Sequence, residues 1–370
     1  MKSILFVGMD VHKETYSLCA INGNTGEVVS ETTCGHEAKF IKSFIDQAKR
    51  KCTDIEEILT GYEAGCLGYS LYKELKVLDI DCHILAPSTM SKSAKNKVVK
   101  NDRLDAKMIA TNLMHGSYKS VYVPNEDDDD IREYLRMISS IKDMIKVTKQ
   151  KIKALLLRQG KHFDGKENWT IKYRKWLKDL ELRPLVRTTL DEYLHHLDRL
   201  EEDLGRYEDV VDKLVEDSPR KDKIEALKCF AGIDTLSAIT IQSEISDFDR
   251  FPKPKALVAY LGLNVGEHSS SDKHNKTSIT KQGNSNVRKT LIECATGIIA
   301  CNPYIKSKRI KARQKGQDIR TITYADKCTK RLHTKYKHLI ERGVKKQIAK
   351  VAIARELTCF IWGMETGNID

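Results

Sequence analysis

The sequence predicts a layered α/β domain at the N-terminus, an α-helical coiled-coil segment in the middle and a mainly α-helical domain at the C-terminus. Short β-rich runs open the chain and then alternate with helical patterns, which is typical of an α/β layer fold. Two narrow apolar stripes follow the acidic run at 125–130, and the composition changes again near residue 227. The expected parts are therefore 1–124, 125–225 and 226–370.

The first part of the chain combines strand and helix patterns. Turn signals separate three β-rich runs at its start, which predicts a meander of three strands. Helical spacing and further β-rich runs then alternate up to Pro87, which ends the last strand. In order, we expect strands at 3–9, 15–21 and 27–32, a helix at about 37–50, a strand ending at Glu63, a helix at 68–78 and a strand at 81–86.

Two helical stripes dominate the middle of the chain. Apolar residues recur mostly at spacings of three and four over 131–158, and a second stripe covers 190–207. Because the stripes are narrow and their flanks are highly charged, we expect a helical hairpin that packs as a coiled coil, within one chain or between chains. Two ordinary helices on a core are the alternative.

The C-terminal part is expected to be mainly helical. Its segment LKCFAGIDTLSAITIQSEI, at 227–245, resembles a helix-hairpin-helix, in which a glycine-containing turn offers backbone N–H groups to a phosphate. That motif alone has low specificity.

The charge of the chain favours a polyanionic partner. The formal net charge is +12, and residues 301–355 contain 17 lysines and arginines but three acids. Nucleic acid is the commonest partner of such a basic protein, so helices in this region are expected to follow a phosphate backbone. Lys345 and Lys346 are the candidate phosphate contacts, and a merely solvated helical face is the alternative.

Two other classes of protein receive no support from the sequence. The ten cysteines show no CxxC spacing, so neither a zinc knuckle nor a disulfide framework is indicated. There is no apolar run of about 18 residues and no cleavage-site pattern after the first strand, so we expect a cytoplasmic protein without a membrane partner.

Four acids form the candidate catalytic centre. Asp10 and Glu63 end two expected strands, and Asp102 and Asp105 lie three apart at the start of an apolar segment. If the two strands are neighbours and the helix lies across their ends, the four carboxylates converge. Converging carboxylates repel one another unless cations neutralise them, and two Mg²⁺ ions about 3.5–4 Å apart can clamp a phosphodiester. This order of acids is typical of a ribonuclease-H-like nuclease domain; helix capping by Asp102 and Asp105 is the alternative.

At these residues the chain resembles a known family. The segments GMDVHKE, YEAGCLGYSLYKEL, VVKNDRLDAKMIA, FAGIDTLSAITIQSEI, LVAYLGLN and HSSSDKHNKTSITKQGNSNVRKTLI are similar to those of the DEDD-type transposases of the insertion sequence 110 family, relatives of the Piv-type DNA invertases. The resemblance covers nearly the whole chain. It implies a RuvC-like N-terminal domain, a coiled coil that mediates dimers and tetramers, and a serine nucleophile in the C-terminal domain. It also implies donor and target DNA as substrates, for some members guided by a non-coding bridge RNA, in the cytoplasm of a prokaryotic cell.

The resemblance places the serine in the segment GEHSSSDKHNKTSITKQGN. By itself this polar segment indicates only an exposed loop between helices. Aligned with the family pattern, Ser270 takes the register of the nucleophile, and Lys281 and Arg288 become candidate phosphate clamps. The chain departs from the pattern, because Ser271 stands where glycine is usual, so Ser269 and Ser271 remain alternatives.

The sequence is therefore compatible with three functions. The leading one is a DNA recombinase that cuts and rejoins strands through a phosphoserine intermediate. The second is a Mg²⁺-dependent nuclease that resolves Holliday junctions with activated water. The third is a coiled-coil scaffold that binds nucleic acid without cleaving it.

Overall fold

The computed structural model describes residues 3–52, 55–65, 67–91, 101–270 and 273–369. The chain divides into two compact units, Met1–Pro124 and Asn125–Asp370, which are described separately. Within the described residues, no helix is long and apolar enough to cross a lipid bilayer.

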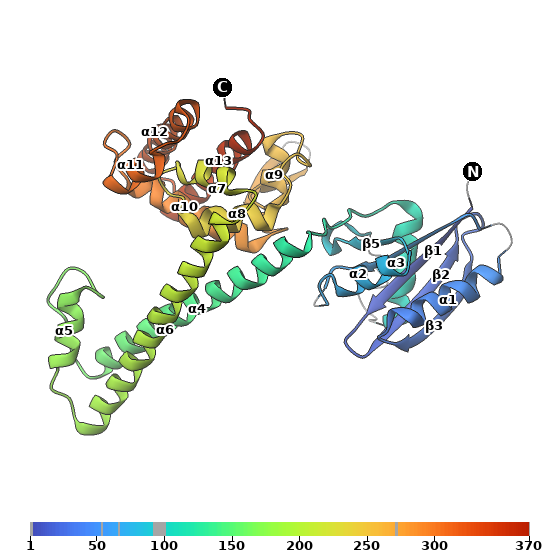
Figure 1. Ribbon diagram of the computed structural model, residues 1–370, viewed down its shortest axis with the longest axis horizontal. Coiled ribbons are helices and arrows are strands. Elements are labelled where there is room, and N and C mark those ends of the chain that lie inside the picture. The colour runs from blue at the N-terminus through green and yellow to red at the C-terminus, as the bar shows by residue number, and fades with distance from the viewer. Residues whose placement is uncertain (1–2, 53–54, 66, 92–100, 271–272, 370) are drawn as a thin grey trace. The chain divides into compact units, whose positions relative to one another are not determined.

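The first unit is built on one mixed sheet with the strand order β3-β2-β1-β4-β5 (Figure 1). The expected meander is confirmed, since β2 pairs antiparallel with both β1 and β3. The expectation that the strands carrying Asp10 and Glu63 are neighbours is also confirmed, because β1 and β4 pair in parallel. The strands are β1 (Ile4–Val11), β2 (Thr15–Asn22), β3 (Val28–Gly35), β4 (Glu57–Glu63) and β5 (Cys82–Leu85).

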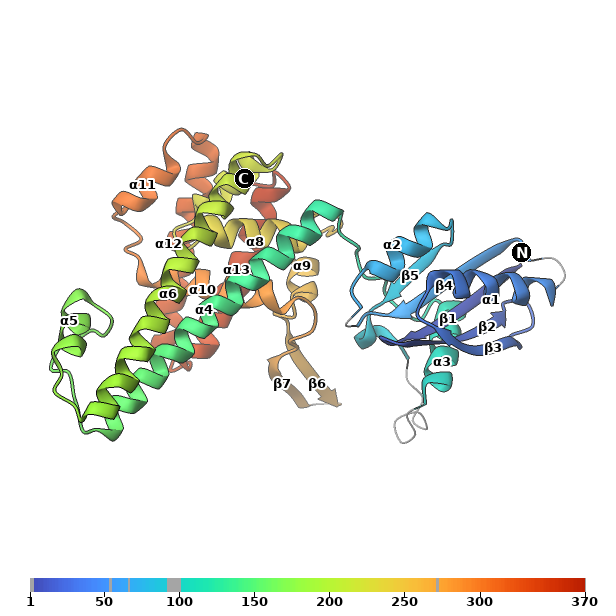
Figure 2. The same cartoon turned by 60° about the horizontal axis from the view of Figure 1, so that its bottom comes forward.

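Helices cover both faces of this sheet, as Figure 2 shows. On one face, α1 (Ala38–Arg50) and α2 (Ser70–Val77) pack on the apolar residues that alternate along β1, namely Leu5, Val7 and Met9. On the other face lies α3 (Asp102–His115), whose Ala106 and Ala110 contact the sheet. A short 3₁₀ helix, η1 (Pro87–Thr89), follows β5.

Gly8 explains how closely α3 approaches the sheet. A Cβ atom at Gly8 would lie less than 3.0 Å from the backbone of Ala106 and Ala110. Since side chains alternate along a strand, Asp10, two residues after Gly8, lies on the same face of the sheet. In α3, Asp102 lies one helical turn before Ala106. The packing therefore brings the first turn of α3 to Asp10.

The second unit begins with a helical hairpin, α4 (Glu126–Arg158) and α6 (Pro184–Glu216), with α5 (Ile171–Asp179) between them. The outer half of the hairpin has its own apolar core, and the inner half shares a core with the C-terminal helices. The acidic run, expected to precede the helix, instead forms its first turn, because acids there complement the helix dipole and the Asn125 side chain caps the helix. Division of this unit into 125–225 and 226–370 stays a prediction.

The rest of the second unit is mainly helical, as expected, and contains one β-hairpin. Its elements are α7 (Lys221–Lys228), α8 (Thr235–Ile245), α9 (Pro254–Tyr260), β6 (Val265–Ser270), β7 (Lys273–Ile279), α10 (Ser285–Ala300), α11 (Lys308–Gln314), α12 (Ile319–Glu341) and α13 (Lys346–Glu365). In the turn between α7 and α8, a Cβ at Gly232 would collide with the carbonyl of Cys294, so close packing on α10 explains this glycine.

Candidate active site

Asp10 and Glu63 lie side by side along the sheet. Met9 and Tyr62 are opposite each other in the parallel register of β1 and β4, and both are fully buried beneath α1 and α2. Asp10 and Glu63 are the next residues on each strand, so their side chains emerge on the opposite face, toward α3. This places two acids at the carboxyl ends of neighbouring parallel strands.

The first turn of α3 brings Asp102 and Asp105 to the same edge. The helix is capped by Asn101, whose Oδ1 accepts a hydrogen bond from the Arg103 N–H at 3.0 Å. Arg103 also donates from Nε to Glu31 of β3 at 2.6 Å, which ties the helix to the sheet. The alternative interpretation, in which Asp102 caps this helix, is wrong, because Asn101 occupies the cap position and leaves both carboxylates for other contacts.

His12 joins two of the acids. Its Nε2 lies 3.3 Å from Asp10 Oδ2 and 3.7 Å from Asp102 Oδ1. Among the described residues, these three side chains offer ligand atoms that all lie within 4.8 Å of one another. Glu63 and Asp105 are not members of that group, although the charge of Asp105 acts on Asp10.

The carboxylate of Asp10 is an unusual group. Burial raises its pKa, the charge and hydrogen bond of His12 lower it, and the charges of Asp102 and Asp105 raise it. Its Oδ2 is shielded from solvent and has no well-formed hydrogen bond in the described part of the chain. A shielded carboxylate oxygen facing two further acids is poorly stabilised by the protein alone.

These residues fit a hard divalent cation. Carboxylate oxygens are its preferred ligands, and Asp10 Oδ2 is shielded from solvent without a well-formed hydrogen bond among the described residues. Sequence reasoning did not identify His12. The signal was present, because a histidine two residues after a strand-end aspartate lies on the same face.

Ser270 is the last residue of β6 and lies opposite Lys273 of β7 in an antiparallel hairpin. The expectation of a plain loop here is therefore wrong for the described residues, since Val265 and the consecutive residues 267–270 pair with β7. Ser271, one of the alternatives, lies outside the described residues.

Arg288 and Lys281 lie at the base of this hairpin. Arg288 Nη1 donates to the carbonyls of Leu261 at 2.9 Å and Gln282 at 3.2 Å, and burial lowers its pKa. Nη1 of Arg288 therefore joins the two chain segments at the base of the hairpin, at Leu261 and Gln282. Lys281 is exposed and has a left-handed backbone, with φ at 57°.

Lys345 and Lys346 begin the last helix. Lys345 is the N-cap residue of α13 and Lys346 is its first residue, and both are exposed. Their contacts with nucleic acid stay a prediction.

The chain is similar to proteins of one family over almost its whole length. A family model described as Transposase, of the DEDD type of IS110, matches residues 7–159, and one described as Transposase IS116/IS110/IS902 family matches 224–309. A putative transposase, y4qE, from Sinorhizobium fredii is 31% identical over 97% of this chain and 88% of its own length.

Two further relatives have similar descriptions. The transposase for insertion sequence element IS1533 of Leptospira borgpetersenii is 31% identical over 92% of this chain and 97% of its own length. The transposase for IS1111A of Coxiella burnetii is 23% identical over 84% of this chain and 81% of its own length.

Proposed function

Because this chain belongs to the IS116/IS110/IS902 family of transposases, enzymes that act on DNA, we propose that it cuts and rejoins DNA through a serine nucleophile and a metal-binding acidic site. The observation that carries the metal half is the geometry around Asp10. Its shielded oxygen, His12 and Asp102 form one cluster on the α3 face of the sheet, with Glu63 on the neighbouring strand end.

The metal half of the proposal is a ribonuclease-H-like, RuvC-like centre. The DEDD domain implies a divalent metal, and we propose Mg²⁺, as two ions held by Asp10, Glu63, Asp102 and Asp105. A bound ion supplies positive charge that favours a serine alkoxide and neutralises charge developing on the phosphate. The protein's contribution is to hold the acids on two strand ends and one helix turn.

The serine half of the proposal is a two-step exchange. Ser270 Oγ loses its proton to a base and bonds to phosphorus, and the bond from phosphorus to one DNA oxygen breaks; that oxygen takes up a proton. Attack by the hydroxyl of an incoming strand then releases the serine and forms the new phosphodiester. The strand's energy is conserved in the phosphoserine ester, so no external energy source is required.

The proposal also includes the partners. Ser270 and the four acids belong to different compact units, so the complete site assembles when those units meet on DNA, in one chain or between protomers. We propose that α4 and α6 mediate dimers and tetramers by coiled-coil packing, and that a bridge RNA guides the enzyme to donor and target DNA in the prokaryotic cytoplasm.

The test is covalent capture of labelled DNA. Ser270→Ala should abolish the protein–DNA adduct while leaving DNA binding intact, whereas Ser269→Ala and Ser271→Ala should keep partial activity. Denaturing electrophoresis detects the adduct and peptide mapping locates it. An adduct on Ser269 or Ser271 would correct the register.

The acids are tested in the same assay. Alanine at Asp10, Glu63, Asp102 or Asp105 should abolish strand exchange with DNA binding largely retained. Full activity of Asp105→Ala would leave that residue only the role of stabilising the first turn of α3. Cleaved DNA without an adduct would favour the alternative function, a Mg²⁺-dependent nuclease that resolves Holliday junctions with water.

A further inference from the structure

Glu244 is a buried carboxylate where three helices of the second unit meet. Its side chain is 2% exposed. Oε1 accepts hydrogen bonds from Arg136 Nε at 3.3 Å and Asn286 Nδ2 at 3.0 Å, and Oε2 accepts from Asn284 Nδ2 at 2.7 Å and from Arg136 Nη2 at 3.5 Å. A buried carboxylate is costly unless its oxygens accept hydrogen bonds, and both do so here. The donors come from α4 and from the start of α10, so the carboxylate joins those helices to α8.

Asn284 extends this contact toward the β6–β7 hairpin. Its Oδ1 accepts hydrogen bonds from the N–H groups of Asn286 and Val287 and caps α10, while its Nδ2 donates to Glu244. Because the oxygen and the nitrogen of the Asn284 amide each have a partner, the side chain of Asn284 is held in a single orientation. Gly283 precedes it with φ at 74°, where a Cβ would collide with the Tyr260 carbonyl, so the path of the chain into α10 is closely constrained.

The hairpin closes only a few residues before Asn284. Thr280 N donates to Asn264 O at 2.9 Å, and Lys281 N donates to Gly262 O at 3.1 Å. Because these bonds join the two ends of the hairpin, its orientation depends on where Asn284 is held.

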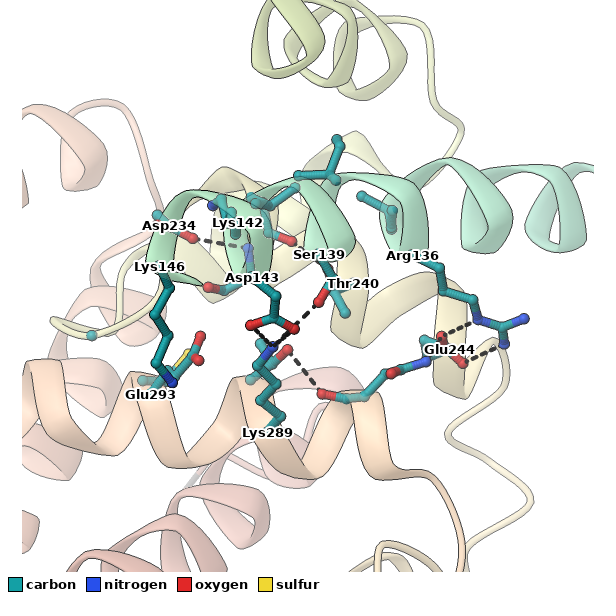
Figure 3. A pocket seen from close by; sticks show the side chains of 18 residues that line it. Arg136, Ser139, Lys142, Asp143, Lys146, Asp234, Thr240, Glu244, Lys289 and Glu293 are labelled. Carbon is teal, nitrogen blue, oxygen red and sulfur yellow. Dashed lines mark hydrogen bonds and ion pairs between the residues drawn. The ribbon is translucent and has the colours of Figure 1, made fainter. Parts of the chain in front are cut away.

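The other end of the contact is α4. Figure 3 shows Arg136 of α4 directed at Glu244, and Lys289 of α10 paired with Asp143 of α4 at 3.2 Å, both on the wall of one cavity of about 350 Å³. On the cavity wall these two polar contacts join α4 to α8 and α10. Because the cavity leaves no packed side chains between the helices at this point, a movement of α4 can reach α8 and α10 here through these polar contacts.

We propose that Glu244 is a positioning residue that holds the base of the β6–β7 hairpin against α4, so that the orientation of the hairpin follows that of α4. The coupling between α4 and the hairpin stands on the hydrogen bonds of Glu244, Asn284 and Arg136. Its consequence for Ser270, that α4 aims the serine, rests on the proposed function.

Two single variants and their combination separate the contact from general packing. Asn284→Asp keeps the oxygen that caps α10 but replaces the donor to Glu244 with a carboxylate oxygen. Glu244→Gln removes the charge at nearly constant volume. In the double variant Glu244→Gln/Asn284→Asp, an amide donates to a carboxylate in the reverse direction and the charge of the site is unchanged. Oε1 still accepts from Arg136 Nε and Asn286, and the 3.5 Å contact of Arg136 Nη2 with the former Oε2 is lost. Arg136→Gln tests the α4 end of the contact.

The control is Glu133→Gln. Glu133 is 71% exposed and accepts a hydrogen bond from Arg136 Nη1 at 2.6 Å. This variant therefore removes a carboxylate that pairs with Arg136, as Glu244→Gln does, but leaves the hydrogen bond between Glu244 and Asn284 unchanged.

The first readout is amide hydrogen exchange of Thr280 and Lys281 in the full-length protein without DNA. Asn284→Asp and Arg136→Gln should speed exchange about tenfold or more, the change expected when a charge-assisted hydrogen bond is removed. The double variant should restore slow exchange, and the control should match wild type. Unchanged exchange in Asn284→Asp, or no restoration in the double variant, would overturn the coupling.

The second readout is the rate of adduct formation at saturating DNA. It should fall in Asn284→Asp and recover in the double variant, with DNA binding constant. If hydrogen exchange speeds up in Asn284→Asp and slows again in the double variant while the adduct rate is the same in both, the role of Glu244 in aiming Ser270 is overturned. A wild-type protein that forms no adduct would instead overturn the proposed function, and the exchange measurement would still decide the coupling.

Discussion

Asp10 shows how one residue can indicate a ligand. Burial raises the pKa of its carboxyl group, the charge and hydrogen bond of His12 lower it, and the charges of Asp102 and Asp105 raise it again. A cation bound by Asp10 and Asp102 would remove both the repulsion and the unfilled hydrogen-bonding capacity of Oδ2. His12 Nε2 lies 3.3 Å from Asp10 Oδ2 and 3.7 Å from Asp102 Oδ1, so a bound metal ion would compete with this imidazole for the same carboxylate oxygens.

Glu365 is a second buried acid, and it predicts a pH dependence. Burial raises its pKa from 4.5 to about 7, partly opposed by a hydrogen bond from Gln242 and the charges of Lys223 and Arg220. Between these pH values the unfolded chain releases a proton that the folded chain keeps. Stability is therefore lost as the pH rises from about 4.5 to about 7, by about 3 kcal/mol in total.

Glu365→Gln should remove this loss. Above pH 7 the variant should be more stable than wild type by about 1–3 kcal/mol, and at pH 4 the two should be equal. Urea unfolding of the full-length protein at pH 4, 6 and 8 measures the difference, with the exposed Glu341→Gln as the control. An equal difference at all three pH values would show that the charge of Glu365 does not determine it.

At the scale of elements, the packing of α3 on the sheet assembles the acidic site. It depends on Gly8, because any side chain there would meet the backbone of α3 at less than 3.0 Å. Gly8→Ala should push α3 away, separate Asp102 from Asp10 and lower the affinity for divalent metal at least tenfold, with a loss of stability of about 1–3 kcal/mol from overpacking. Calorimetric titration with Mn²⁺ measures the affinity.

Gly205→Ala is the matched control, because a Cβ at Gly205 in α6 meets no atom within 4 Å. It should leave metal affinity unchanged and stabilise the helix slightly. If Gly8→Ala bound metal as tightly as wild type, the contact between α3 and the sheet would not be what assembles the site.

Most helices and strands of the first unit can be predicted from the sequence, but some contacts and one β-hairpin cannot. Alternation and helical spacing predict strands and helices because burial of one face produces those periods, and this places Asp10 and Glu63 at strand ends. The same patterns do not predict the β6–β7 hairpin, because the strand sequences VGEHSS and KHNKTSI contain few apolar residues and show no apolar alternation. The cap at Asn101 rather than Asp102 depends on backbone geometry at a single residue, and the hydrogen-bond partners of the Glu244 carboxylate are up to 108 residues distant along the chain.

At the scale of the whole molecule, the candidate acids and the candidate serine belong to separate compact units. Within each unit, packing holds its own half in place: α3 on the sheet for the acids, and the contact of α4, α8 and α10 for the hairpin. Substitutions in one unit should therefore leave the folding of the other unchanged. The proposed function requires the two units to act on the same DNA, and the distribution of charge predicts where the second unit contacts it.

The positive charge of the molecule is concentrated near its C-terminal end, where 17 of the 64 lysines and arginines lie in residues 301–355. Neutralising Lys345 and Lys346 together, as Lys345→Gln/Lys346→Gln, should weaken binding nearly equally for all nucleic-acid sequences, because phosphate contacts carry no sequence information. Each lysine–phosphate pair that the substitutions remove should reduce the slope of log affinity against log salt by about 0.7–0.9. Fluorescence anisotropy at several salt concentrations measures the slope, and Lys13→Gln, in the first unit and 90% exposed, is the control. The same slope in both variants would mean that the two lysines at the start of α13 only solvate the helix.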